Sequence, residues 1–198
     1  MVIAGTIAAC NTGKNRGANE TGSSFGADSG FDGNFYPFPQ YLEGQLAYVD
    51  SMPFALEMIR TLNGRTVDSS YVDRQLLHRD IEPFFEEDPN NDELKKHFKE
   101  NAFEDLSVDA ITFSIVALAE KTKLRQADIL LDPATQRVKT VNIRRAFTRG
   151  DSSVFQNLLW VHNYRCQLVE EIKLQNGENL QRITRYTWDA PPGDSFVD

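Results

Sequence analysis

Carboxylates gather in one stretch of the chain, and closely spaced carboxylates can bind calcium or form the acid–base pair of a glycoside hydrolase. The members of this acidic patch are Asp80, Glu82, Glu86, Glu87, Asp88, Asp92 and Glu93. Asp88, Asn90 and Asp92 have the spacing of the first three ligands of a calcium loop. The pattern then fails, because Glu93 stands where the sharp turn needs glycine and Lys99 where the bidentate glutamate belongs. The sequence therefore predicts a solvated loop, and a hydrolase that uses these acids is the least favoured of three functional hypotheses.

The other groups that could do chemistry are scattered along the chain. His78, His97 and His162 lie far apart, and none has the spacing of a metal-binding motif. The sequence contains no G-x-S-x-G nucleophile turn, phosphate loop or dinucleotide fingerprint. An Arg-Gly-Asp triplet at 149–151 matches an integrin-binding signal, but Gly-Asp also suits a hairpin turn, which is the favoured interpretation. We therefore predict no catalytic residue, no bound metal and no cofactor.

The two cysteines have different surroundings. Cys166 alternates with apolar residues in a strand-like run, which predicts a buried thiol. Cys10 follows Ile7, Ala8 and Ala9. An aliphatic residue, two small residues and a cysteine resemble the lipobox of bacterial lipoprotein precursors. The resemblance implies that a diacylglycerol is attached to Cys10 and that residues 1–9 are a residual signal peptide. No basic residue precedes the short apolar stretch, which suggests a start assigned too far downstream or a truncated chain.

The segment after Cys10 predicts a flexible tether over residues 10–35. Half of the 12 glycines lie between 11 and 34, among many Asn, Ser and Thr residues, and only Phe25 and Phe31 are large and apolar. Such a segment cannot bury enough apolar surface to offset the entropy of ordering it. A Gly-rich coil of this length reaches roughly 25–30 Å, enough to hold a folded domain away from lipid headgroups.

The charge of the chain excludes some partners. With 21 basic and 29 acidic residues, the net charge is −8, so we expect no nucleic-acid partner, because such a surface normally needs a basic patch. Attachment to anionic lipid by charge alone is equally disfavoured. The apolar run at 1–10 is too short to span a bilayer, and no other segment is a candidate.

Helices are predicted in the first half of the folded domain, which we place at residues 36–190. Apolar residues at helical spacing predict a helix over 53–62, with Asn63 and Gly64 as its C-terminal cap. A second helix is predicted over 69–85, where Pro83 ends or kinks the apolar face. Asn90 and Glu93 have capping-box spacing and predict the start of a third helix.

The second half of the domain is predicted to be a sheet. Alternation of apolar and polar residues predicts strands at 111–115, 127–131, 138–147, 154–161, 164–174 and 180–188. Asn176-Gly177 between the last two strands is a strong hairpin signal. The predicted fold class is therefore α+β, with short N-terminal helices packed on one face of a five- or six-stranded antiparallel meander and a tail at 191–198.

Aromatic and arginine side chains of the last strands suggest an interaction surface, because neither face of the final strand is cleanly apolar. The candidate residues are Trp160, Tyr164, Arg182, Arg185, Tyr186 and Trp188. An ordinary half-exposed edge strand is the alternative interpretation.

The order of segments also resembles uncharacterised envelope lipoproteins of bacteroidete-type Gram-negative bacteria, which have a Gly/Asn tether, short helices and a long-stranded meander that ends in a Trp-Asp strand. This resemblance implies a location and a fold but no activity. The leading hypothesis is a lipoprotein of the cell envelope, anchored in the outer membrane and facing the periplasm or the cell surface. Its non-catalytic α+β domain is expected to bind another protein or an envelope component. The second hypothesis is a carrier or sensor of a small apolar ligand held between helices and sheet.

Overall fold

The computed structural model describes residues 34–105 and 109–189. Cys10, the predicted signal peptide, nearly all of the predicted tether and the predicted tail at 191–198 lie outside these residues. The predictions made for those segments therefore stay predictions.

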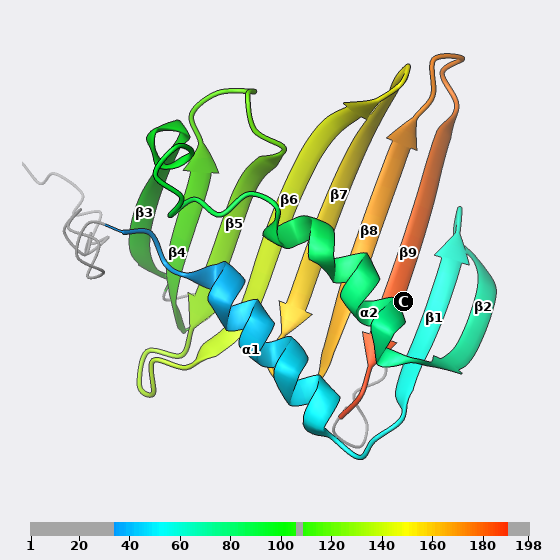
Figure 1. Ribbon diagram of the computed structural model, residues 1–198, viewed down its shortest axis with the longest axis horizontal. Coiled ribbons are helices and arrows are strands. Elements are labelled where there is room, and N and C mark those ends of the chain that lie inside the picture. Colours follow the sequence, from blue (N-terminus) through cyan, green and yellow to red (C-terminus); the bar gives the residue numbers. More distant parts are fainter. Residues whose placement is uncertain (1–33, 106–108, 190–198) are drawn as a thin grey trace, which may run out of the picture.

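The described residues form one antiparallel sheet of nine strands, in the order β2-β1-β9-β8-β7-β6-β5-β4-β3. The strands are β1 (Leu56–Leu62), β2 (Arg65–Val72), β3 (Phe98–Asp105), β4 (Ala110–Ala117), β5 (Leu124–Leu131), β6 (Val138–Arg149), β7 (Ser152–Val161), β8 (Arg165–Lys173) and β9 (Asn179–Thr187). Strands β3 to β9 form a meander, and the β1–β2 hairpin joins it because β1 pairs with β9. The sheet is curved, and helices α1 (Phe38–Ser51) and α2 (Arg74–Ile81) cross one of its faces (Figure 1).

The predicted fold class was wrong. The molecule is mostly β, with nine strands instead of five or six and two α-helices among the described residues. Residues 53–62, predicted as a helix, contain β1, whose Leu56 and Met58 alternate toward the core. Asn63 and Gly64 have φ values of +47° and +77° and form the β1–β2 turn. Asn-Gly serves a hairpin as readily as a helix end, and here the long-range pairing of β1 with β9 decides between them.

Two further predictions also fail in this region. The predicted helix over 69–85 begins only at Arg74, because residues 65–72 form β2, and it ends as α2 before a short 3₁₀-helix, η1 (Glu82–Phe85), that contains Pro83. Asp73 caps α2 by accepting a hydrogen bond from the backbone N–H of Gln75. No long helix starts at Asn90; a 3₁₀-turn, η2 (Lys95–His97), leads directly into β3.

The meander was predicted more accurately than the helices. Gly177, at φ +85°, lies in the β8–β9 turn, and Gly150, at φ +58°, lies in the β6–β7 turn, so both hairpin predictions are confirmed. The free thiol of Cys166 is fully buried, also as predicted.

The core lies between helix α1 and the sheet. Phe38, Leu42, Leu46 and Val49 of α1 are buried at helical spacing. They belong to one hydrophobic cluster with the sheet residues that point toward the helices, including Trp160, and with Leu77 and Ile81 of α2. We call the sheet face that carries the helices the inner face.

Candidate binding site

A row of polar side chains crosses the inner face on four neighbouring strands. Cross-strand pairing places Arg182 of β9 beside Glu170 of β8, Glu170 beside Gln156 of β7, and Gln156 beside Arg145 of β6. We call these four residues the polar row. Charged and amide side chains on a core-facing sheet surface need partners, because an unpaired buried polar group is costly.

The polar row supplies those partners itself. Arg182 Nη1 donates to Glu170 Oε1 at 3.2 Å, and Gln156 Nε2 donates to Glu170 Oε2 at 2.8 Å. Arg145 Nη1 donates to Gln156 Oε1 at 3.0 Å. The row is therefore one continuous network in which each side chain fixes the position of its neighbour.

Arg145 is the buried end of this row. Its side chain is 4% exposed, and its Nη2 donates to Glu86 Oε2 at 3.1 Å. Its guanidinium also lies 5.3 Å from the ring centre of Phe84 and 5.5 Å from that of Phe147. Burial lowers the pKa of Arg145, and the nearby Glu86 opposes that change. The segment after α2 is thus attached to the sheet through a charged group.

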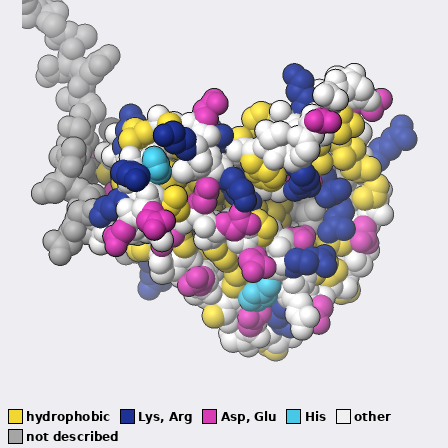
Figure 2. Space-filling view, turned by 45° about the horizontal axis from the view of Figure 1, so that its top comes forward, with side chains coloured by type: hydrophobic (Ala, Val, Ile, Leu, Met, Phe, Trp, Pro, Cys, Tyr) yellow, Lys and Arg dark blue, Asp and Glu magenta, His cyan; other side chains and the backbone are white. Residues whose placement is uncertain are grey.

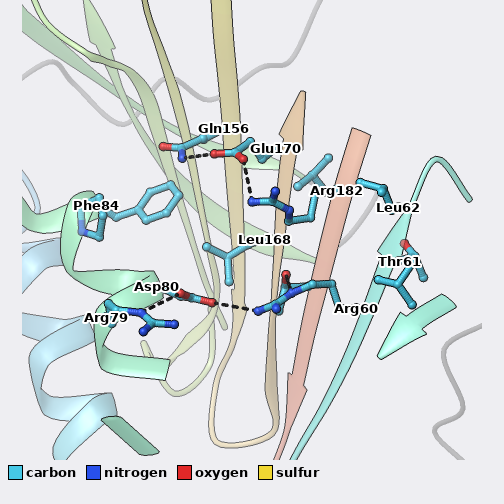
Figure 3. A pocket seen from close by; sticks show the side chains of 14 residues that line it. Arg60, Thr61, Leu62, Arg79, Asp80, Phe84, Gln156, Leu168, Glu170 and Arg182 are labelled. Carbon is cyan, nitrogen blue, oxygen red and sulfur yellow. Dashed lines mark hydrogen bonds and ion pairs between the residues drawn. The ribbon is translucent and has the colours of Figure 1, made fainter. Parts of the chain in front are cut away.

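A cleft opens at the other end of the polar row. Its volume is about 560 Å³, and it lies between the α2–η1 segment and strands β1, β2, β7, β8 and β9. The side chains that line it include Arg60, Arg79, Asp80, Phe84, Leu168 and Arg182 (Figure 3). In the space-filling view the surface is hollowed right of centre, and Lys and Arg side chains gather on the right of the hollow (Figure 2).

Asp80, at the end of α2, contacts three other side chains beside the cleft. Its Oδ2 accepts a hydrogen bond of 2.6 Å from the hydroxyl of Tyr186, and it lies 3.8 Å from Arg60 Nη2 and 3.8 Å from Arg79 Nε. Burial, followed by the bond to Asp80, raises the pKa of Tyr186, so this hydroxyl stays protonated and donates. Arg60 Nε also donates to Thr184 Oγ1 at 3.3 Å.

The cleft is mixed in polarity but its charge is positive. Three arginines and two carboxylates, Asp80 and Glu170, line it, which gives a net charge of +1 in a chain of net charge −8. Carbon atoms come from Leu62, Val67, Phe84 and Leu168. A few charged groups on a partly apolar concave surface are typical of a small-molecule site.

The six residues predicted as an interaction surface do not lie together on one exposed surface. Trp160, Tyr186 and Trp188 are buried, and the rings of the two tryptophans are 5.1 Å apart. Tyr164 is 39% exposed, in the turn between β7 and β8.

The two arginines of that set point to different faces of the sheet. Arg182 lines the cleft, whereas Arg185, three residues along β9, is on the opposite face and donates to Gln167 at 2.9 Å. Among the predicted surface residues, Arg182 is therefore the one whose charged group belongs to the candidate site.

The acidic patch is dispersed. Asp80 lines the cleft, and Glu86 pairs with Arg145 and with Lys123. Glu87 accepts backbone hydrogen bonds from Lys123 and Leu124, and Asp88 Oδ1 accepts one from the N–H of Asn90. Within residues 34–105 and 109–189, no group of three or more His, Cys, Asp or Glu side chains is arranged to hold a metal ion.

Two of the three histidines have defined partners. His162 Nδ1 lies 2.7 Å from the hydroxyl of Tyr41, which connects the β7–β8 turn to α1. His78 Nε2 lies 3.0 Å from Asp50, which connects α2 to α1. Both contacts join elements of the fold, and neither residue lines the cleft.

Sequence reasoning missed Arg60, Arg145, Gln156 and Glu170. A signal was present, because Arg145, Gln156 and Glu170 each occupy a position where the strand alternation places an apolar residue two positions earlier or later. A charged residue at an inward position marks either an uncovered part of the face or a paired polar network.

Comparison of the chain with protein-family models, curated protein sequences and solved structures gave no match. In the part of the chain that the structure describes, no helix combines the length and the apolar character needed to cross a membrane.

Proposed function

We propose that this chain is a membrane-anchored binding protein of the cell envelope and that the cleft beside α2 holds its ligand. The anchoring part of the proposal is supported by the sequence alone, through the lipobox-like residues 7–10 and the Gly-rich segment after them. The binding part is supported by the cleft, which is the single observation that carries it.

The cleft favours a small molecule over an envelope protein as the ligand. A concave site of about 560 Å³ is within the usual range for small-molecule pockets. The space between α1 and the sheet, where an apolar ligand was expected, is filled by core side chains such as Phe38, Leu42 and Trp160. The proposed site therefore lies on the same inner face, in the part that α1 leaves uncovered.

Glu86 and Asp80, two carboxylates of the acidic patch, have surroundings that suit a structural role better than a role in hydrolysis. A general acid of a glycosidase needs a raised pKa. The hydrogen bond from Lys123, with the charge of Arg145, lowers the pKa of Glu86. Asp80 is held by Tyr186 and lies beside two arginines. The environment of Glu86 therefore favours its charged form. Asp80 orients the arginines beside it.

The binding proposal can be tested with N-phenyl-1-naphthylamine, an uncharged dye whose fluorescence increases in apolar surroundings. We expect saturable binding to the wild-type chain and strongly reduced binding to Leu168→Trp, which adds an indole to the cleft. Leu159→Trp is the matched control, because Leu159 is on the opposite face of the neighbouring strand β7. Equal binding by both folded variants would place the dye elsewhere and reject the cleft as the site.

The anchoring proposal needs a separate measurement. The intact mass of the protein from membranes of a host that expresses it with its upstream DNA should show loss of everything before Cys10 and gain of a diacylglyceryl group. The Cys10→Ser variant should stay unmodified. An unmodified wild-type chain in the soluble fraction would contradict the proposed anchor without affecting the cleft.

A further inference from the structure

We infer that the ligand of the cleft is an anionic amphiphile, with a carboxylate or phosphate group that binds between Arg60 and Arg182 and an apolar body that lies along Leu168 and Phe84. This inference rests on the proposed function, because it names the ligand class of that same site.

Arg60 has donors left over for an anion. Its Nε is used by Thr184, and its Nη2 is 3.8 Å from Asp80, which is an ion-pair distance and longer than a hydrogen bond. Its guanidinium points into the cleft from β1 (Figure 3). Because a guanidinium carries five N–H groups, Arg60 can donate two hydrogen bonds to a carboxylate or phosphate while it keeps the bond to Thr184.

Arg182 faces the same space from the adjacent strand. Cross-strand pairing places Leu62 opposite Arg182 and Arg60 opposite Thr184, so the two arginines are diagonal neighbours on the inner face. Arg182 uses Nη1 to bind Glu170 at 3.2 Å. Its side chain is 46% exposed, so its remaining N–H groups are accessible from the cleft.

Each of the two carboxylates of the cleft lies beside two arginines, so the negative charges are fewer than the positive charges around them. Glu170 binds Arg182 and Gln156 and lies 4.0 Å from Arg149. Asp80 lies beside Arg60 and Arg79 and also accepts the Tyr186 bond. An added anion would balance the surplus positive charge, whereas an added cation would be repelled by it.

An apolar surface adjoins the arginines on the floor of the cleft. Leu168 lies between Glu170 and Asp80, and Phe84 faces it from η1 (Figure 3). Leu62 and Val67 add carbon atoms on the β1–β2 side. A free inorganic anion would leave this surface unused, whereas an alkyl chain would remove it from water.

The test uses four compounds with a straight chain of ten carbon atoms and different head groups: decanoate, decyl phosphate, decanol and decyltrimethylammonium. Each competes with N-phenyl-1-naphthylamine for the full chain, below its micelle concentration, and inorganic phosphate is the fifth competitor. We expect at least one of the two anions to bind roughly tenfold more tightly than decanol, the cation to bind more weakly than decanol, and inorganic phosphate not to compete. Whichever anion binds more tightly identifies the head group as carboxylate or phosphate.

Variants assign the effect to the two arginines. Arg60→Gln and Arg182→Gln should each remove most of the preference for the anion over decanol, while decanol still binds. Arg144→Gln is the matched control, because Arg144 is on the opposite face and has its own acidic partner, Asp128, at 3.0 Å. It should keep the wild-type preference.

The outcomes separate this inference from the proposed function. If decanol binds as tightly as both anions, or if Arg60→Gln and Arg182→Gln keep the preference, the anionic inference is rejected although the cleft still binds ligands. If inorganic phosphate competes as well as decyl phosphate, the apolar body is rejected. If the dye does not bind or Leu168→Trp has no effect, the proposed function itself fails.

Discussion

Two parts of the inner face lie on the same three strands and have opposite properties. Trp160, Cys166 and Tyr186 are paired across β7, β8 and β9, are fully buried and form part of the core with α1. Four residues along each strand, Gln156, Glu170 and Arg182 are paired in the same way, and all three line the cleft. We call these the covered part and the uncovered part. The same three strands therefore stabilise the fold in the covered part and form a candidate binding site in the uncovered part.

Hydrogen bonds connect the covered part to its surroundings. Gln45 of α1 accepts from Trp160 Nε1, and Tyr186 donates its hydroxyl to Asp80 in the wall of the cleft. Variants should therefore affect stability most in the covered part and ligand binding most in the uncovered part.

The largest stability effect is expected from Trp160→Ala. Trp160 is fully buried, so its removal should leave a cavity and lower the free energy of unfolding by about 3–5 kcal/mol. Urea unfolding followed by circular dichroism measures this. Leu159→Ala, on the opposite and half-exposed face of the same strand, should cost clearly less. Equal losses would remove the distinction between the covered face and the outer face.

Gln45→Ala should have the next largest effect. Gln45 Oε1 accepts from Trp160 Nε1 and from the backbone N–H of Asn163, both at 3.1 Å. Its loss leaves a buried indole N–H without a partner, which should cost about 1–3 kcal/mol. Gln40→Ala, at an exposed position of the same helix, should change the free energy of unfolding by less than about 0.5 kcal/mol. A cost for Gln45→Ala no greater than that for Gln40→Ala would contradict the bridging role.

Arg145→Met should cost less than either, about 1–2 kcal/mol, because Glu86 keeps Lys123 as a partner and is half-exposed to water. Arg149→Met should change stability by less than about 0.5 kcal/mol, since Arg149 is exposed and lies 4.0 Å from its acidic partner. Thermal and urea unfolding of both variants give the comparison. A gain in stability for Arg145→Met would show that the polar row is kept at a cost to the fold.

The smallest effect concerns pH. Burial lowers the pKa of His162 below its ordinary value of 6.5, and the charge of Arg137 adds to this. Below pH 6.5 the unfolded chain therefore binds more protons than the folded chain, so stability should fall as the pH decreases through this window. The melting temperature should drop from pH 7.5 to pH 5.5 in the wild-type chain, and this drop should be smaller in His162→Gln. An identical drop in both would exclude His162 as its source.

The extent to which the sequence predicted the structure differs between regions. Strands β5 to β9 were predictable, because alternation and turn residues such as Gly150 and Gly177 are local signals. Strands β1 and β2 were not, because Asn63-Gly64 fits two kinds of turn and the choice depends on pairing with β9, more than 100 residues away. Strand β3 was also missed, because Lys99, Glu100 and other polar residues hide its alternation.

The candidate site was even less accessible from the sequence. Trp160 and Tyr186 suggested an exposed surface because strand patterns do not show which part of a sheet a distant helix covers. The position of the cleft depends on which parts of the strands α1 and α2 cover. That is a property of the tertiary structure, which local sequence patterns do not show.

The most direct test of the central claim is to map the binding of the tighter-binding anion, decanoate or decyl phosphate, by the ¹H–¹⁵N chemical shifts of the backbone amides. Shifts should concentrate around Arg60, in α2–η1 near Asp80 and Phe84, and at Leu168 and Arg182, while the amides of α1 and those around Trp160 stay unchanged. Shifts concentrated in the covered part or on the opposite face of the sheet would contradict the claim that the uncovered part of the inner face is the binding site.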